Sequence, residues 1–101
     1  MARYGFAIVR GRSMEPTLRD GDRLLVRYGT VPQPGRLAVV RLPGRNGASV
    51  KRITRRDADG WWVERDNPTE GVDSWLVGAV PDADLLAVVL GRVWPHPRWR
   101  F

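Results

Sequence analysis

Short apolar runs bounded by Gly, Pro, Asp or Asn recur along the whole chain. Seven of them are rich in β-branched and aromatic residues: YGFAIVR (4–10), DRLLVRY (22–28), RLAVVRL (36–42), ASVKRIT (48–54), GWWVERD (60–66), DSWLVGAV (73–80) and DLLAVVLGRVW (84–94). This composition is typical of strands, and Asp57 to Gly60 fit a tight hairpin turn. No segment keeps the 3.6-residue period beyond two turns, although DADLLAVV fits a helical turn that begins behind Asp82. We therefore predict an all-β protein.

The length and the composition limit the classes that remain. The chain has 101 residues, of which 43% are apolar and five are tryptophan, so we expect one domain over residues 1–101 with a modest core. No cysteine is present and His96 is the single histidine, so we expect no disulfide, no metal site and no cofactor. The longest apolar run, 85–91, is far shorter than the ~20 residues of a membrane helix. We expect a cytoplasmic protein without a transmembrane segment.

The net charge of +6 raises the possibility of a nucleic-acid partner. The arginines, however, are spread from Arg3 to Arg100 among acidic residues, and no known nucleic-acid-binding motif is present, so we expect no such partner. The tail WPHPRWRF (94–101) mixes arginine with aromatic residues and proline. We interpret it as a frayed, solvated end; docking on an acidic surface or on lipid headgroups is the alternative, and would allow at most peripheral membrane contact.

The basic residues are sixteen arginines and one lysine, Lys51. Biased codon usage explains this imbalance if Lys51 is an ordinary surface cation. The functional explanation is that position 51 needs an amine that can lose its proton near neutral pH, which a guanidinium cannot do. Taken alone, the count does not separate the two.

Ser13 follows the predicted strand FAIVR at a Gly11-Arg12 break, and Pro16 restricts the backbone three residues later. A serine here is either a turn-capping residue or a hydroxyl presented at a rigid strand end. In SVKRI, strand alternation places Lys51 on the same face as Ile53, so an inward Ile53 also makes Lys51 point inward. Burial lowers the pKa of an amine, and a neutral amine can accept a hydroxyl proton. Ser13 and Lys51 are thus candidates for a hydrolytic pair.

The order of the segments adds a family resemblance. GRSMEPTL, GDRLLV, VKRI and DNPTEGVDS, which cover about residues 9 to 80, resemble the motif series of the type I signal peptidase family of serine/lysine proteases. The resemblance implies the compact, barrel-like β fold of that catalytic core, with Ser13 as nucleophile and Lys51 as general base. The GWW before DNP and the late LGRV are most similar to the soluble bacterial maturation proteases of nickel-type superoxide dismutase.

Several positions depart from the pattern of that family. Gly11 stands where a hydroxyl residue often helps to bind the oxyanion, so the backbone of Gly11, Arg12, Ser13 and Met14 would have to support it. The usual Gly-Asp-Asn and Asp-Ser-Arg become Arg65-Asp66-Asn67 and Asp73-Ser74-Trp75, and Gly71 replaces a serine that orients the lysine in some members.

For the residues around these departures, two interpretations stay open. Five residues are candidates for supporting the pair or lining a substrate groove: Pro16, Asp66, Asn67, Asp73 and Ser74. For Asp66, Asn67 and Asp73, the alternative role is formation of an irregular turn around Pro68 and Gly71. Adjacent strand residues face opposite sides, so one of Trp61 and Trp62 should be core and the other is a candidate groove wall.

The resemblance implies a serine endopeptidase that removes an N-terminal propeptide from a protein precursor, by cleavage after a small residue. Two alternatives remain: a membrane-associated signal peptidase I that processes exported proteins, and a non-catalytic β-barrel binding module.

Overall fold

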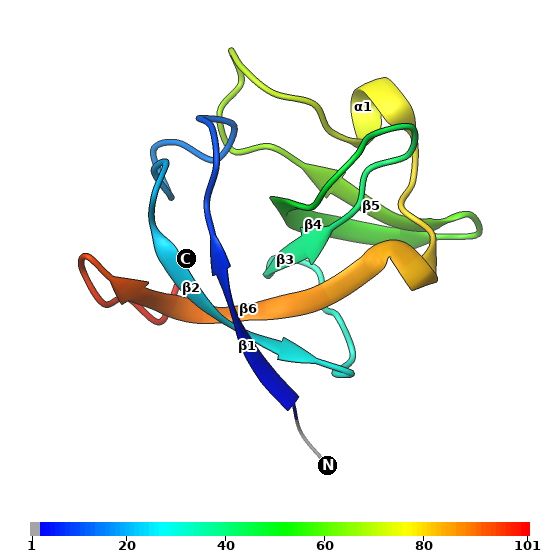
Figure 1. The fold of residues 1–101 in the computed structure, drawn as a ribbon. Coiled ribbons are helices and arrows are strands. Elements are labelled where there is room, and N and C mark those ends of the chain that lie inside the picture. Colours follow the sequence, from blue (N-terminus) through cyan, green and yellow to red (C-terminus); the bar gives the residue numbers. More distant parts are fainter. Residues whose placement is uncertain (1–2) are drawn as a thin grey trace.

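Six antiparallel strands form one sheet in the computed structural model, which describes residues 3–101 (Figure 1). The strands are β1 (Arg3–Ile8), β2 (Arg23–Tyr28), β3 (Leu37–Val40), β4 (Ser49–Asp57), β5 (Gly60–Glu64) and β6 (Leu85–Trp94). Their order in the sheet is β1-β2-β6-β3-β4-β5, so β1 and β5 lie at the two edges. The predicted all-β class is confirmed, and β4 and β5 form the expected hairpin with Asp57 paired to Gly60.

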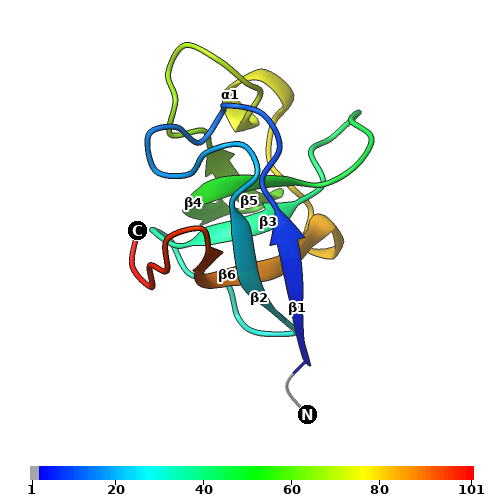
Figure 2. The same cartoon turned by 60° about the vertical axis from the view of Figure 1, so that its left-hand side comes forward.

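The sheet curls over itself around the long strand β6 (Figure 2). β6 contains register shifts against both of its neighbours, and such bulges bend a strand. Val26 of β2 and Val50 of β4 belong to one buried cluster, although β6 and β3 separate their strands in the sheet. A second cluster, with Ala38 and Ile53 at its centre, covers the opposite face of β3 and β4. β3 and β4 are therefore buried on both sides, and a polar residue on β4 can lie deep in the protein.

One predicted strand is wrong. DSWLVGAV (73–80) forms the short helix α1 (Ser74–Val77), and only Val80 keeps a bridge, to Trp61. Asp73 causes the turn, because its carboxylate accepts a hydrogen bond from the N–H of Trp75 and caps the helix. The one-turn 3-10 helix η1 (Asp82–Asp84) confirms the helical turn predicted at Asp82.

The C-terminal tail is solvated, as expected, because residues 94–100 are exposed, but it is not frayed. Arg92 and Arg98 exchange two backbone hydrogen bonds of 2.7 and 3.0 Å, which fold the tail back on β6. The Trp99 ring lies directly on Gly91, where a Cβ atom would approach it to 2.2 Å. Phe101 packs against the first buried cluster. Because Gly91 has no side chain, the Trp99 ring of the tail can lie directly over it.

Among residues 3–101, no helix has both the length and the apolar character needed to cross a membrane.

Candidate active site

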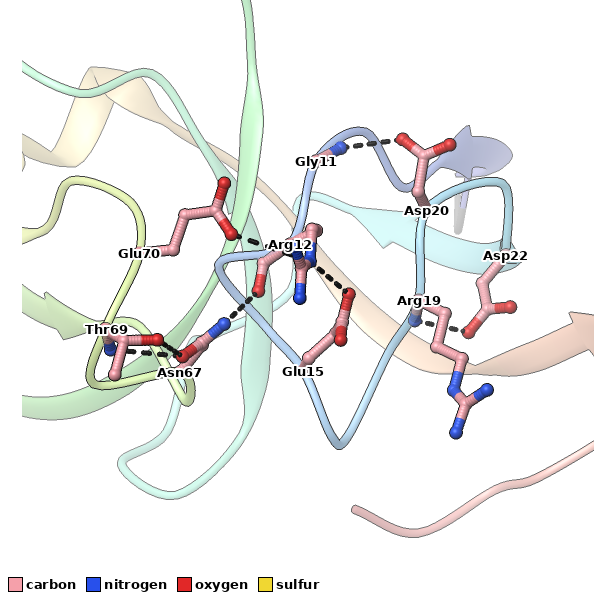
Figure 3. Close-up of polar contacts among 9 residues, drawn as sticks. All are labelled: Gly11, Arg12, Glu15, Arg19, Asp20, Asp22, Asn67, Thr69 and Glu70. Atoms are coloured by element: carbon pink, nitrogen blue, oxygen red, sulfur yellow. Dashed lines mark hydrogen bonds and ion pairs between the residues drawn. The ribbon is translucent and has the colours of Figure 1, made fainter.

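Ser13 lies on a loop that joins β1 to β2, and backbone contacts close the base of this loop. Val9 donates to the carbonyl of Asp22 (2.8 Å) and accepts from Gly21 (2.7 Å). Higher in the loop, the N–H of Gly11 donates to Asp20 Oδ1 over 2.7 Å (Figure 3). Met14 is buried in the first cluster and fixes the loop from beneath. Ser13 is therefore presented by a constrained segment, as predicted.

Lys51 reaches Ser13 from β4. Its Nζ donates a hydrogen bond of 2.8 Å to Ser13 Oγ, and the lysine is only 3% exposed. Ile53, two residues further on, is fully buried, so the predicted inward direction of Lys51 is confirmed. Burial holds the pKa of Lys51 below its ordinary value; the charge of Asp73 opposes this shift, and that of Arg65 adds to it. Burial therefore makes this amine, which contacts a hydroxyl group, easier to deprotonate than a free lysine.

Asp66 ties the loop of Ser13 to the strand of Lys51. It accepts two hydrogen bonds from Arg52, Nε to Oδ1 at 2.9 Å and Nη2 to Oδ2 at 2.7 Å, and one from Thr17 Oγ1 at 2.6 Å. Burial alone would raise the pKa of Asp66, but these hydrogen bonds and the Arg52 charge outweigh it and leave that pKa below its ordinary value. Asp66 therefore supports the site from a distance and does not touch Lys51 or Ser13.

Asn67 holds the backbone of the loop that carries Ser13. Its N–H donates to the carbonyl of Ser13 (2.8 Å), and its Nδ2 donates to that of Arg12 (2.9 Å). Its Oδ1 accepts from the N–H and the hydroxyl of Thr69, which forms a turn (Figure 3). The turn role and the supporting role, which the sequence left as alternatives, are combined in this residue.

Asp73 and Ser74 have structural partners. Asp73 Oδ2 accepts from the N–H of Arg65 (3.1 Å), in addition to the helix cap. Ser74 is buried, and its Oγ accepts from the N–H of Val63 (2.9 Å). Asp73 acts on Lys51 through its charge and not through a hydrogen bond.

Gly71 lies against Ser13. A Cβ atom at this position would come within 2.4 Å of Ser13 Cβ, and the φ angle of +107° is one that L side chains rarely adopt. Some members of the signal peptidase family that the sequence resembles have a serine at the corresponding position. A serine at position 71 cannot be accommodated in this backbone. The tight contact restricts the Ser13 side chain instead.

A groove of about 540 Å³ opens beside Ser13 and Lys51. Its walls are the end of β1 and the two residues that follow it (7–10), the β3–β4 loop with Arg45, and the segment 70–72. Gly11, Arg12 and Met14, which are candidates for nucleophile support, also line it. Arg12 is held at the rim by ion pairs with Glu15 (3.2 Å) and Glu70 (3.6 Å) (Figure 3).

Other candidate residues lie outside the groove. None of the five residues proposed for its wall or for support of the pair lines it: Pro16, Asp66, Asn67, Asp73 and Ser74. Neither tryptophan of the pair lines it either, so the expected groove wall was wrong. Trp61 packs against the second cluster, and Trp62 makes an edge-to-face contact with Trp75 at 5.3 Å.

The sequence reasoning missed Arg52 and Thr17, which complete the Asp66 contacts. Arg52 is one of sixteen arginines, and nothing in its local pattern distinguishes it. Strand alternation, which predicted the inward direction of Lys51, also places Arg52 on the opposite face of β4. A search for an acidic partner of Arg52 on that face could have found the contact with Asp66.

Comparison with known proteins gives the family of the chain. Residues 2–89 match the Peptidase S24-like family. The chain is also 31% identical over 114 residues to the mitochondrial inner membrane protease subunit 1 of Schizosaccharomyces pombe, an alignment that covers 88% of this chain and 73% of that protein. These matches support the predicted relation to signal peptidase-like proteins. The chain belongs to the Peptidase S24-like family.

Proposed function

We propose that this protein is a serine endopeptidase in which Ser13 is the nucleophile and Lys51 the general base. The observation that carries the proposal is the 2.8 Å contact between the chain's one lysine, itself buried, and a hydroxyl on a constrained loop. Hydrogen-bond distance between a nucleophile and a base of lowered pKa is the geometry that nucleophilic catalysis needs. The family match supports peptidase chemistry in general.

In the first half of the reaction, the neutral amine of Lys51 accepts the Ser13 proton as Oγ attacks the scissile carbonyl carbon. The C–N bond then breaks, and Lys51 returns the proton to the leaving amine, which gives an acyl-enzyme. In the second half, the same amine accepts a proton from water as the water oxygen attacks the ester carbonyl carbon. The bond between this carbon and Ser13 Oγ then breaks, and Lys51 returns the proton to Oγ, which releases the acyl product as a carboxylic acid and restores both residues. One base thus serves both halves.

Backbone N–H groups are the candidate oxyanion donors. Among residues 3–101, the N–H groups of Ser13 and Met14 donate to no acceptor of the chain, and both residues line the groove. Donors fixed in place before the reaction stabilise the developing charge without reorganisation. Gly11 carries no hydroxyl, so this role rests on the backbone.

The groove suits an extended peptide. β1 is an edge strand, and its end forms one wall of the groove, so a substrate can add to the sheet beside Ser13. We propose a protein precursor with an N-terminal propeptide as the substrate, with cleavage after a small residue and action in the cytoplasm. The GWW and LGRV segments support the nickel-type superoxide dismutase precursor as the specific substrate.

The second candidate substrate is an exported protein with a signal peptide. The matched relative is named as an inner membrane protease subunit, which supports this candidate. Incubation with each purified precursor, followed by mass spectrometry of the new N-termini, separates the two. We expect a single cut in the precursor of the superoxide dismutase; a cut in the signal-peptide substrate alone favours the second candidate.

The nucleophile is tested in the same assay with Ser13→Ala. We expect turnover to be abolished while the free energy of unfolding falls by only about 1 kcal/mol, because Lys51 loses one hydrogen-bond partner. Thr30→Ala removes a hydroxyl outside the groove and is the matched control, with turnover unchanged. If Ser13→Ala keeps activity within about tenfold, the nucleophile is misassigned, and a non-catalytic binding module becomes the better account.

A further inference from the structure

The floor of the groove beside Ser13 is apolar. Apart from Lys51, the buried residues that line the groove carry hydrocarbon or thioether side chains: Val9, Met14, Leu42 and Val50. Among residues 3–101, no aromatic residue lines the groove. The floor can therefore take a small apolar side chain, but it offers no ring on which a nucleic-acid base could stack.

Two arginines lie on the rim of the groove without an acidic partner. Arg10 follows β1, and Arg45 lies in the β3–β4 loop, which projects from the sheet (Figure 2). Both residues are exposed, and within residues 3–101 neither forms an ion pair. Because the two arginines come from different walls, an extended segment bound in the groove would pass close to both.

The acidic residues beside the groove are already paired. Glu70 is the one acidic residue among residues 3–101 that lines the groove, and it lies 3.6 Å from Arg12. Arg12 also pairs with Glu15 at 3.2 Å (Figure 3). Two carboxylates therefore compensate the charge of Arg12, whereas the charges of Arg10 and Arg45 can pair with a ligand.

We propose that the groove selects peptide segments in which an acidic residue stands next to the residue that faces the floor. Successive side chains of an extended peptide point to opposite sides, so one enters the floor and its neighbours face the rim. A Glu or Asp at a rim position would accept hydrogen bonds from Arg10 or Arg45, and a Lys or Arg would be repelled. This inference rests on the proposed function, because it names the substrate class of the same site.

The test compares three pools of short labelled peptides in which every second residue is Glu, Gln or Lys. The other positions hold the same mixture of Ala, Ser and Val in all pools. Fluorescence anisotropy with the Ser13→Ala protein measures binding apart from cleavage. We expect the Glu pool to bind about three- to tenfold tighter than the Gln pool, as one or two partly exposed ion pairs allow, and the Lys pool to bind most weakly. Added salt should reduce the difference.

Substitutions of the two arginines, made in the Ser13→Ala protein, test their roles. Arg10→Gln and Arg45→Gln should each lower the ratio of Glu-pool to Gln-pool affinity by about twofold or more. Arg45→Glu should strengthen binding of the Lys pool, which a merely structural role of Arg45 would not do. Unchanged melting by circular dichroism shows that these effects are not loss of fold.

Arg19→Gln is the matched control. Arg19 is exposed and lies on the same β1–β2 loop as Ser13, but it does not line the groove. Within residues 3–101 it forms no ion pair, and its hydrogen bond to Asp22 comes from the backbone N–H, which glutamine retains (Figure 3). The variant removes the same charge from the protein and should keep the full preference for the Glu pool.

Three results would overturn the proposal. The first is that the Ser13→Ala protein binds the Glu and Gln pools equally, or binds neither. The second is that Arg19→Gln lowers the affinity ratio as much as Arg45→Gln does. The third is tighter binding of a single-stranded oligonucleotide than of the Glu pool, with the same dependence on Arg45, which would assign the groove to phosphate groups.

Cleavage of the same pools by the wild-type chain, followed by mass spectrometry, separates this proposal from the peptidase function. A preference for the Glu pool in binding, without cleavage of any bound peptide, supports the acidic selectivity and contradicts the peptidase function. Cleavage of all three pools at equal rates supports the peptidase function and contradicts the acidic selectivity.

Discussion

Arg52 and Asp66 form a two-contact ion pair directly beside the candidate base, with distances of 2.9 and 2.7 Å. Arg52 follows Lys51 on β4, and Asp66 also accepts a hydrogen bond from Thr17 on the Ser13 loop. One carboxylate thus connects the strand that carries the base to the loop that carries the nucleophile. The 2.8 Å contact between Lys51 and Ser13 depends on how these two segments are held together.

Replacement of this carboxylate should destabilise the protein and lower its turnover. In Asp66→Asn, one hydrogen bond from Arg52 is lost, and the positive charge of Arg52 is left without a partner. We therefore expect the free energy of unfolding to fall by about 1–3 kcal/mol. We expect kcat to fall with little change in KM, because the Ser13 loop shifts relative to Lys51. Urea unfolding and peptide kinetics measure the two effects.

The same pair sets a dependence of stability on pH. The folded-state pKa of Asp66 is lowered, so its contribution is present above the unfolded-state value of about 3.9 and is lost as the pH falls further, through the folded-state pKa. Stability differences between the wild-type chain and Asp66→Asn should therefore shrink below about pH 4. The exposed pair of Asp82 and Arg56 is the control, and Asp82→Asn should cost less than about 0.5 kcal/mol. A constant difference across this pH range would contradict the assignment.

Gly71→Ala should abolish activity out of proportion to its effect on stability. The added Cβ would contact Ser13 Cβ at 2.4 Å and displace the nucleophile. Gly78→Ala is the matched control: it also has a positive φ, +87°, but nothing lies within 4 Å of the added atom. Both variants should lose about 1–2 kcal/mol from backbone strain, and only Gly71→Ala should lose turnover. Equal turnover in the two would show that the contact with Ser13 does not matter.

Much of the fold follows from local pattern, because each confirmed strand is a β-branched or aromatic run bounded by turn residues. The 57–60 hairpin turn and the inward direction of Lys51 were predictable for the same reason. The 73–80 segment looks like a strand in composition, but the Asp73 side chain caps a helix there, and a cap outweighs a weak strand preference over so short a run.

Contacts between segments that are far apart in the sequence could not be predicted from the local pattern of residues. The Arg52–Asp66 pair joins residues 14 apart, and the Thr17 contact spans 49, so neither has a periodic signature. The tail folds back because Trp99 finds space over Gly91, which only the arrangement of β6 reveals. The proximity of Ser13 and Lys51 was expected from the family resemblance and from strand alternation together, and the structure places them within hydrogen-bond distance.

The rate of peptide cleavage should rise with pH through one ionisation, at a pH below the ordinary lysine value of about 10.4. Burial lowers the pKa of Lys51, so the active neutral amine forms at lower pH than in a free lysine. Asp73 opposes this shift by its charge, so Asp73→Asn, which can still cap α1, should move the profile to lower pH. A pH–rate profile for kcat/KM measures both, and a shift to higher pH in the variant would contradict this electrostatic account.

Lys51→Arg tests most directly whether Lys51 acts as the base. The substitution keeps the positive charge and most of the stem, but a guanidinium does not lose its proton at working pH. Arg41→Lys, at an exposed pair with Asp84, is the matched control for exchange of the two cations and should cleave normally. In a peptide-cleavage assay on folded protein, we predict a rate for Lys51→Arg that is lower by roughly 10³ or more, the range seen when one member of a nucleophile–base pair is lost. Cleavage by Lys51→Arg at a near-normal rate would contradict the Ser13–Lys51 mechanism.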